Sequence, residues 1–540
     1  MSQELCDLGL PSLTDDEHGT ECLYWFRRCL RFHDNPALLD ATQISHSVRC
    51  IYIIDPSTIG AGARVESNKW RFLLECLHDL DMTLRKHKSR LYVVQGQPAY
   101  ILPLLFKDWH INVLSMEEDP TPYGARRDEA IGCLAQDHGV EVLHRSSHTL
   151  HSILAWKSVL GGKVLTTLHQ FSKIFHIPGP PEHLNEEVIF QHLAKAVSKT
   201  DNSDRYNIPT LEQLGLESTK GVAVWKGGET EALKRLSYHL ERRAWVACFD
   251  EPRMPADSLM ASPNVIGPYL NFGCLSSRLV YWKMDELYRK MNGLESEPPV
   301  SLHGQLVLRE FWYLMANLHR NFDQVEGNRL CLQVPWRQAD KKIMKRVVMA
   351  KTGFPWIDAI MKQLVEEGWI HSMAKHALIS FITHGQLFCS WEEAAQLLEK
   401  YCLEGDTCTN AGVAMLLSGS SHAKPIPSDT ESPILTGKHI DPSANYIRLY
   451  LPVLRSFPSQ YIYEPWTAPL DVQQKAQCVI GREYPSPMLE HYQALHSNML
   501  TLQQMLKSIS DSRGVKVRTH QRYPPEISSS RTHGRLKTVQ

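Results

Sequence analysis

Short apolar runs alternate with helical patterns between residues 22 and 143, and this alternation restricts the fold more than any other feature of the chain. Each run has the length of a β-strand and is largely apolar, as expected for strands that are buried on both faces. Strands that alternate with helices predict an α/β domain built on a doubly wound parallel sheet. The predicted strands are Leu23–Phe26, Cys50–Ile54, Arg90–Val94, Val113–Met116 and Val140–Leu143.

Polar segments that contain arginine and aspartate follow these strands. They would lie at the carboxyl edge of the sheet, where doubly wound sheets place their ligands. No GxGxxG motif follows the first strand, so an ordinary dinucleotide-binding fold is not supported.

The domain organisation follows from length and from a change in pattern. A chain of 540 residues is too long for one core. Residues 178–215 are rich in proline and polar residues and are typical of a connector, and from Trp225 to about residue 510 the pattern is helical. We expect a flexible leader (1–20), an α/β domain (21–150), a connector (151–224), an all-helical domain (225–510) and a basic, disordered tail (511–540).

Charge and cysteine usage exclude several classes of protein. The formal net charge of -1 gives no global attraction to nucleic acid or membrane. No run of about 18 apolar residues is present, so no transmembrane helix is expected, and the acidic N-terminus lacks the pattern of a signal peptide. The 13 cysteines are scattered without a CxxC pair, which predicts reduced intracellular thiols and no metal site.

The C-terminal region carries two further signals. Apolar residues recur at steps of three and four and predict a helix, which either packs on its own domain or is offered to a partner. Beyond it, the tail from Arg513 holds seven Lys or Arg against Glu526, which suits a solvated tail, nuclear targeting or nucleic-acid contact. The stripe comprises Tyr492, Leu495, Met499, Leu502, Leu506 and Ile509.

Several ordered motifs resemble those of the photolyase/cryptochrome family. The opening motif is WFRRCLRFHDNPAL (25–38), and later ones are GGETEAL (227–233), PYLNFGCLS (268–276), TGFPWID (352–358) and YIYEPW (461–466). The resemblance covers roughly residues 22–510. It is strongest to animal cryptochromes of the vertebrate-like, transcription-repressing type, and the animal (6-4) photolyases are close relatives.

The resemblance implies an N-terminal α/β domain and a helical domain that holds FAD in a U-shaped conformation. It also implies a cavity between the domains, edged by a serine-containing loop near Ser146, Ser147 and His148. It leaves an antenna chromophore undetermined. The residues expected to contact FAD are Gly267, Gln305, Arg309, His371, Ser372, Lys375, Glu404, Asp406 and Asn410.

Two of these residues suit FAD and others depart from the family. Gln305 and Arg309 lie four residues apart, on one face of a helix, and Arg309 is expected to neutralise phosphate charge. The family's phosphate-side loop ends in Ser-Pro-Tyr-Leu-Arg, whereas this chain has Gly267 and Asn271 at the two ends. One hydroxyl donor and one cation are therefore missing.

The acid/base residues of the family are also altered. The family usually has two adjacent histidines and a third four residues after the second, and the second and third act on the lesion in a (6-4) photolyase. This chain has His371, Ser372 and His376 at the three positions. A serine is a poor proton donor near neutral pH, so we interpret both histidines as structural. The family's buried Arg–Asp pair corresponds to Lys375 and Glu404, which form either a retained ion pair or two unrelated surface charges.

The family's tryptophan chain for electron transfer to the flavin is broken. Trp391 and Trp336 match its middle and outer members, but the inner member falls at Ala414 and a fourth position at Phe388. Leu308 replaces a tryptophan of the lesion pocket. Light-driven flavin reduction by the usual route should therefore be crippled. Residues 418–439, aromatic in the family, are interpreted here as a loop with reduced packing.

These departures favour a light-independent circadian regulator that represses transcription by binding proteins. The resemblance implies clock proteins as partners (period-type proteins, bHLH activators and a ubiquitin-ligase subunit), weak DNA binding, no membrane, and a location in nucleus and cytoplasm. The alternatives are an FAD-dependent (6-4) DNA photolyase, a blue-light photoreceptor, and a degenerate paralogue with no role. Enzymatic activity stays open, with Ser372 and Ala414 against it.

Overall fold

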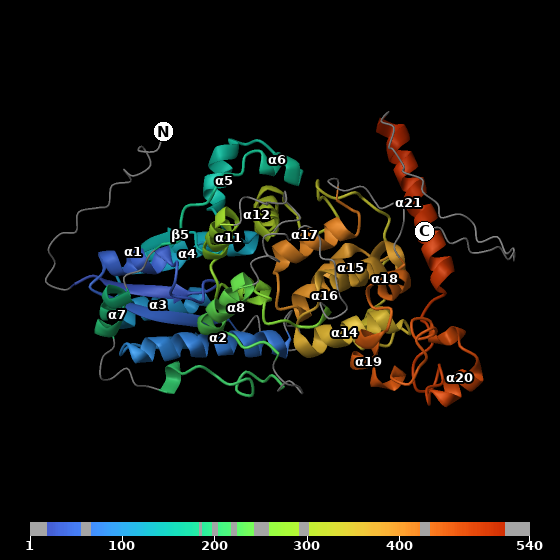
Figure 1. Ribbon diagram of the computed structural model, residues 1–540. Helices are drawn as coiled ribbons and strands as arrows, with labels where there is room; N and C mark the ends of the chain where they lie inside the picture. Colours follow the sequence, from blue (N-terminus) through green and yellow to red (C-terminus); the bar gives the residue numbers. More distant parts are fainter. Residues whose placement is uncertain are drawn as a thin grey trace.

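The computed structural model describes residues 19–55, 66–182, 186–196, 204–217, 224–241, 259–290, 302–421 and 432–513. The leader up to residue 18, the tail from residue 514 and residues 422–431 of the expected 418–439 loop lie outside these ranges. Figure 1 shows an α/β part, drawn in blue, beside a larger helical part that ends in one long helix.

Five parallel strands form one sheet in the order β3-β2-β1-β4-β5, which confirms the predicted doubly wound fold. Because β1 lies between β2 and β4, the chain reverses its direction of winding at β1. The strands are β1 (Glu21–Phe26), β2 (Ser47–Ile54), β3 (Leu91–Gln95), β4 (Val113–Glu117) and β5 (Glu141–Arg145).

Strand β1 is apolar from Cys22 to Phe26 because it is buried on both faces. Tyr24 and Phe26 enter one hydrophobic core, and the alternate residues Leu23 and Trp25 enter another on the opposite face. Both faces of the sheet are thus covered by helices, as side-chain alternation in a buried strand requires. The first core is covered by α1 (Pro36–Ile44), α2 (Ser67–Lys86) and α7 (Glu186–Lys195), and the second by α3 (Pro98–Asp108) and α4 (Pro122–Asp137).

The expected connector contains short helices of its own. Helix α7 packs against β2 and so belongs to the α/β core. The other elements of this stretch are α5 (Ile153–Leu160), α6 (Leu168–Ser172) and η2 (Asp204–Tyr206).

The second domain is helical in the described ranges, where its only β-type pairings are isolated bridges. Its core is continuous from α12 to the segment before α21. The helices are α8 (Glu229–Glu241), α10 (Gly267–Asn271), α11 (Ser277–Lys290), α12 (Leu302–Leu318), α13 (Lys341–Val348), α14 (Pro355–Glu367), α15 (Ser372–Ser380), η4 (Phe381–Gly385), α16 (Trp391–Tyr401), α17 (Thr407–Leu417), α18 (Pro433–Ile440), α19 (Asn445–Tyr450), α20 (Leu470–Lys475) and α21 (His491–Arg513).

The prediction of a loop over 418–439 is wrong at its C-terminal end. Helix α18 begins at Pro433, and Ser432 caps it by accepting a hydrogen bond from the backbone N–H of Leu435 at 3.4 Å. A proline at the first helical position favours helix initiation, because its missing N–H has no partner there anyway.

Helix α21 packs on its own domain through a face that the apolar stripe only partly marks. His491, Asn498 and Leu502 are buried, whereas Tyr492 of the predicted stripe is 60% exposed. The side chain of Ile509 lies outside the described part. Polar residues contribute to this packing: Asn498 donates from Nδ2 to the backbone carbonyl of Gln386 at 3.0 Å.

Gly273 lies at a close contact between the two domains. It has a φ of +69°, and a Cβ atom there would lie 1.7 Å from the carbonyl oxygen of Arg28. Only glycine satisfies both constraints. Buried Arg31 strengthens the junction by donating to the carbonyl oxygens of Gly273 at 2.9 Å and Ser147 at 2.7 Å.

Within the described residues, no helix combines the length and apolar character needed to cross a membrane. The same residues contain no cluster of histidine, cysteine and acidic side chains that could hold a metal ion. The cysteines that the structure describes are free thiols, as the scattered pattern predicts.

Candidate functional site

Asp406 starts helix α17 and is the centre of the site. Its Oδ1 accepts hydrogen bonds from the backbone N–H groups of Cys408 at 3.1 Å and Thr409 at 3.2 Å, and Thr409 Oγ1 accepts from the N–H of Asp406 at 2.9 Å. This reciprocal arrangement is a capping box, which satisfies N–H groups that a helix start leaves free. It fixes the position of Asn410 one turn later.

The second carboxylate oxygen of Asp406 faces the other domain. Arg28 donates from Nη1 to Asp406 Oδ2 at 2.6 Å, and the Tyr313 hydroxyl donates to the same oxygen at 2.8 Å. Burial raises the pKa of Asp406, but Arg28, Tyr313 and the Thr409 N–H outweigh it and lower the pKa overall. Asp406 is therefore ionised and joins the two domains.

Glu404 and Lys375 form the ion pair that their matched positions suggest. The Lys375 ammonium lies 2.5 Å from Glu404 Oε2, and the Trp369 indole donates to Glu404 Oε1 at 2.8 Å. Burial lowers the pKa of Lys375, but Glu404 reverses this and raises it above its ordinary value. The alternative of two unrelated surface charges is wrong.

Gly267 lies against the same carboxylate. A Cβ atom at position 267 would be 2.3 Å from Glu404 Oε1 and 2.6 Å from its Cδ atom. The longer glutamate thus fills the space that a serine would need, so Gly267 and Glu404 are sterically matched. Asn271, at the other end of this short helix, donates from Nδ2 to the carbonyl oxygen of Leu403 at 2.9 Å.

His371 and Ser372 begin helix α15. His371 is its N-cap, and its Nδ1 accepts from the backbone N–H of Met373 at 3.2 Å. Burial lowers the pKa of His371 to about 4, so the ring is neutral near pH 7. This capping contact supports the interpretation of His371 as structural. Ser372 is exposed and His376 is half-buried.

Arg309 and Gln305 lie on one face of helix α12, as their spacing predicts. Arg309 donates to the carbonyl oxygen of His148 at 3.0 Å and from Nη2 to the His148 ring nitrogen Nε2 at 2.6 Å. A guanidinium can only donate, so the His148 proton must be on Nδ1. Gln305 is exposed. Among the described residues Arg309 has no carboxylate partner.

Two buried N–H donors along the contact of α12 and α17 lack hydrogen-bond partners in the part of the chain that the structure describes. They are Nδ2 of Asn410 and Nε1 of Trp312, in side chains that are 6% and 4% exposed. Trp312 packs directly on α17, since a Cβ atom at Gly412 would lie 2.3 Å from its ring. An unpaired buried donor costs about 1–3 kcal/mol, so an acceptor group that pairs with either donor would be stabilised here.

The donor set therefore fits one half of FAD better than the other. The carbonyl and ring-nitrogen acceptors of isoalloxazine suit Asn410, Trp312 and exposed Gln305. The diphosphate meets Arg309, but it finds no side-chain donor at Gly267, and the Glu404 carboxylate lies beside that glycine.

The aromatic residues expected to carry electrons do not form a continuous chain. Trp391 is fully buried and donates from Nε1 to Cys331 Sγ at 3.3 Å, but it makes no ring contact with another described residue. Trp336 instead packs against Phe388, with ring centroids 5.1 Å apart. Ala414 is fully buried. Leu308 is half-buried against the helical core.

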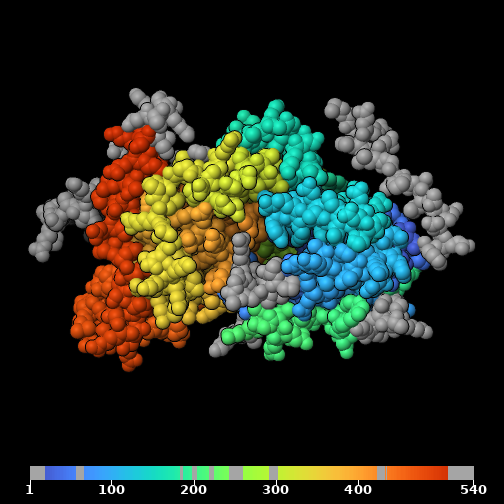
Figure 2. All heavy atoms as spheres, turned by 180° about the vertical axis from the view of Figure 1, so that it is seen from behind, coloured from blue at the N-terminus to red at the C-terminus, as the bar shows by residue number. Residues whose placement is uncertain are grey.

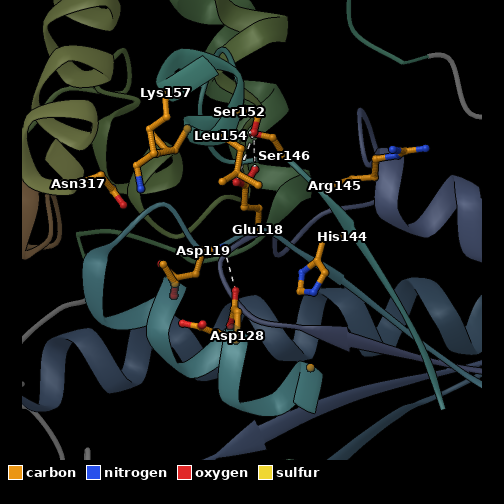
Figure 3. A pocket seen from close by; sticks show the side chains of 14 residues that line it. Glu118, Asp119, Asp128, His144, Arg145, Ser146, Ser152, Leu154, Lys157 and Asn317 are labelled. Carbon is orange, nitrogen blue, oxygen red and sulfur yellow. Dashed lines mark hydrogen bonds between the residues drawn. The ribbon is translucent and has the colours of Figure 1, made fainter. Parts of the chain in front are cut away.

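A cavity of about 460 Å³ is lined almost entirely by residues between Glu118 and Lys157, with Asn317 as its one lining residue from the helical domain (Figure 3). Ser146 lines it, whereas Ser147 and His148 are buried behind it. The view shows the Ser152 hydroxyl directed at Glu118, to which it donates at 2.9 Å. The remaining labelled walls are Asp119, Asp128, His144, Arg145, Leu154, Lys157 and Asn317, the last from the helical domain.

Arg28, Tyr313, Trp369 and Trp312 also belong to the site, although sequence reasoning assigned them no role there. All four lie inside or beside motifs that the resemblance covers, but no local pattern marks their contacts. Arg28 and Asp406 are 378 residues apart in the chain, so only the fold brings them together.

Comparison with known proteins gives consistent matches. Residues 22–182 match the family model "DNA photolyase", and residues 301–504 match "FAD binding domain of DNA photolyase". The chain is 46% identical to Cryptochrome-1 of Sylvia borin over 501 residues, which are 92% of this chain and 80% of that protein. It is 46% identical to Cryptochrome-2 of Gallus gallus over 497 residues, covering 91% and 84% of the two chains.

Solved structures show the same fold at lower sequence identity. A bacterial class III photolyase from Agrobacterium tumefaciens superposes with a TM-score of 0.74 at 23% identity, covering 92% of this chain and 100% of that one. A cryptochrome from Synechocystis gives a TM-score of 0.73 at 20% identity, covering 90% and 100%.

Proposed function

This chain belongs to the photolyase/cryptochrome family, and we propose that it is a cryptochrome that represses transcription in a circadian clock without requiring light. The proposal combines its similarity to vertebrate cryptochromes with the chemistry of its altered pocket.

The observation that carries the proposal is the break at Ala414. Photoreduction needs an unbroken path of oxidisable rings to the flavin. Ala414 has no ring, and Trp391 makes no ring contact among the described residues. A function that does not depend on electron flow therefore fits this chain best.

The acid/base groups give independent support. Of the two acid/base positions, the second and third histidines of the family, Ser372 offers only a hydroxyl and His376 keeps a histidine. A proton donor to a DNA lesion would need a group that titrates near neutral pH. The (6-4) photolyase alternative lacks such a group at Ser372, one of the two positions that it requires.

FAD, when bound, supplies redox chemistry and blue-light absorption. Asn410 and Gln305 would hold the isoalloxazine, and Arg309 would face the phosphates. Trp369 and Lys375 hold the Glu404 carboxylate in place. In this proposal, these residues make the flavin pocket a rigid structural unit rather than a reaction centre.

We propose clock proteins as partners: period-type proteins, bHLH activators and a ubiquitin-ligase subunit. The cavity lined by Ser146 and the exposed face of α21, which carries Tyr492, are the surfaces offered for them. The basic tail suits nuclear entry, and we propose that the protein occupies nucleus and cytoplasm.

A blue-light photoreceptor is the second candidate. The unpaired N–H group of Asn410 favours it, because a bound flavin would offer that donor an acceptor. Photoreduction of flavin in the purified protein would support this candidate.

The proposal is tested by co-precipitation of the full chain with a period-type protein and the bHLH activators, together with a reporter assay in the dark. We expect binding and repression. Loss of both, with the protein expressed and folded, contradicts the proposal. Light-dependent repair of a (6-4) lesion by the purified protein would establish the photolyase alternative instead.

A further inference from the structure

Ser486 lies in an irregular segment that leads into helix α21, which begins at His491. The serine is exposed, and Pro485 and Pro487 flank it. A residue that precedes proline is restricted to an extended backbone conformation. An exposed, extended serine followed by proline is the feature that proline-directed protein kinases recognise in their substrates.

Ser486 differs from the other three residues of the chain in which a serine or threonine precedes proline. Thr121 and Ser432 are buried, and their hydroxyl oxygens cap α4 and α18. Ser262 is half-buried, and its hydroxyl accepts from the backbone N–H of Asn264 at 3.4 Å. The Ser486 hydroxyl makes no hydrogen bond to a described residue. It is therefore the hydroxyl of the four that is both exposed and unused in the part of the chain that the structure describes.

The backbone around Ser486 is held against the loop that precedes α14. The N–H of Met488 donates to the carbonyl oxygen of Thr352 at 2.9 Å. Gly353 has a φ of +82°, and a Cβ atom there would lie 2.5 Å from the Ser486 carbonyl oxygen. A Cβ atom at Gly481 would lie 3.3 Å from Ser486 Oγ, so the glycine at position 481 leaves the hydroxyl uncrowded.

Arg346 of α13 holds its guanidinium at the backbone of Ser486. It donates from Nη2 to the Ser486 carbonyl oxygen at 3.3 Å and from Nε to the Lys351 carbonyl oxygen at 3.1 Å. Arg346 is half-buried and forms no ion pair with a described residue. A guanidinium has five N–H donors, so several remain for an anion. Figure 2 shows the yellow surface that includes α13 beside the orange-red surface of the segment that leads into α21.

The acids closest to Ser486 in the chain are bonded elsewhere. Glu483 accepts from the backbone N–H of Val479 at 2.8 Å, and Glu490 accepts from the backbone N–H of Gln493 at 2.7 Å. Neither carboxylate is paired with the Arg346 guanidinium, so this cation is free to neutralise a new anion at Ser486.

We propose that Ser486 is a phosphorylation site for a proline-directed protein kinase and that Arg346 binds the phosphate. In the transfer, Ser486 Oγ forms a bond to the γ-phosphorus of ATP, and the bond from that phosphorus to the bridging oxygen of ADP breaks. The hydroxyl proton passes to the catalytic aspartate of the kinase. The proposal does not involve the flavin pocket, and it holds whether or not the protein represses transcription.

The position of the guanidinium suits a phosphate on this side chain. The carbonyl oxygen that Arg346 contacts and the Oγ atom belong to one residue, so rotation about the Cα–Cβ bond between staggered rotamers brings the phosphate to the guanidinium. A phosphoserine carries about 1.5–2 negative charges near pH 7 and three acceptor oxygens, which a guanidinium can bind in a bidentate manner. Phosphorylation would thus add a charged link between α13 and the segment before α21.

The first experiment incubates the purified full chain with a mitogen-activated protein kinase and ATP and locates phosphate by mass spectrometry. Leu489, three residues after Ser486, is not basic, so this kinase is a better probe than a cyclin-dependent kinase, which prefers a cation there. We expect phosphate on Ser486, and S486A should lose that phosphate alone. An unmodified Ser486, with the kinase active on a standard substrate, overturns the proposal.

The second experiment measures the pKa of the phosphate by a ³¹P NMR titration of the phosphorylated full chain, in which the signal absent from S486A is that of residue 486. An unpaired phosphoserine has a second pKa of about 6. Because Arg346 favours the dianion, we expect a pKa about 0.3–0.7 unit lower in wild type. R346Q should return it to about 6, whereas R346K should keep part of the shift.

The matched control is K341Q, which removes an exposed cation from the first turn of the same helix. It makes the same change in net charge as R346Q but leaves the guanidinium in place, so most of the pKa shift should remain. Equal phosphate pKa values in wild type and R346Q, or equal effects of R346Q and K341Q, would overturn the role of Arg346.

Discussion

Arg28 of the α/β domain and Asp406 of the helical domain form a direct ion pair, with Nη1 and Oδ2 2.6 Å apart. Their side chains are 28% and 8% exposed, and Arg28 also lies 3.5 Å from Asp119. The pair fixes the start of α17 against the sheet edge, so the flavin-side helix and the α/β domain behave as one structural unit.

Asp406→Asn should destabilise the protein by about 2 kcal/mol, because it removes one of the two carboxylates that neutralise the partly buried Arg28 and leaves only Asp119. The measurement is the free energy of unfolding in urea. The control is Asp40→Asn, which breaks the pair with Arg145 at 2.5 Å, where the Arg145 side chain is 56% exposed. That change should shift stability by less than about 1 kcal/mol. Equal losses of stability in the two variants would contradict the stabilising role of the Arg28–Asp406 ion pair.

Gly267→Ser should lower stability by about 1–3 kcal/mol, since its Cβ would overlap the Glu404 carboxylate at 2.3 Å. Glu404→Asp shortens that side chain, so the double variant should recover most of the loss. Thermal unfolding of wild type, both single variants and the double variant gives the coupling directly. Additive effects would show that the two positions are independent.

Asn410→Leu tests whether a flavin is held. In flavin-free protein the change should be neutral or stabilising, because it removes an unpaired buried donor. It should also lower any bound flavin, read from the absorbance band near ~450 nm. The control is Asn328→Leu, where Nδ2 donates to the Phe322 carbonyl at 2.9 Å and Oδ1 accepts from the Leu330 N–H at 2.9 Å.

The control should cost about 2 kcal/mol, because it leaves two buried backbone groups unpaired. If Asn410→Leu destabilises flavin-free protein as strongly as Asn328→Leu does, then Asn410 Nδ2 has a hydrogen-bond acceptor in that protein, which contradicts its unpaired state.

Stability should fall as the pH drops from about 6.5 to 4. Burial, and then nearby His376, lower the pKa of His384 to about 4 from an ordinary value of 6.5. The unfolded chain therefore binds the proton first, and stability that is present above pH 6.5 is lost progressively towards pH 4, by up to about 3 kcal/mol for this ring.

His384→Gln should flatten the pH profile of the unfolding free energy in that window. His78→Gln, at an exposed position of α2, is the control. A profile of His384→Gln that is as steep as wild type would contradict the account.

Much of the fold could be predicted because it depends on local patterns. Apolar runs such as Leu23–Phe26 mark strands buried on two faces, and β1 indeed divides its side chains between two cores. The helix over 433–440 was missed because the preceding polar stretch dominated the pattern. The stripe on α21 was only partly informative, since polar His491 and Asn498 are buried there by specific hydrogen bonds.

The site could be predicted where a residue of this chain matches a functional position of the family and keeps the same charge. Lys375 and Glu404 kept their charges, and the structure pairs them. The Arg28–Asp406 pair and the overlap of Gly267 with Glu404 were not predictable, because both depend on how distant segments meet. The unpaired donor of Trp312 likewise becomes visible only when α12 packs on α17.

Repression by the full chain in the dark and under blue light tests light independence most directly. Trp391→Phe and Trp336→Phe, assayed at matched protein levels, remove the remaining tryptophans of the electron path. We predict repression of equal strength in both conditions and in both variants. Repression that requires blue light, or that is lost with Trp391→Phe in a folded protein, would contradict the account.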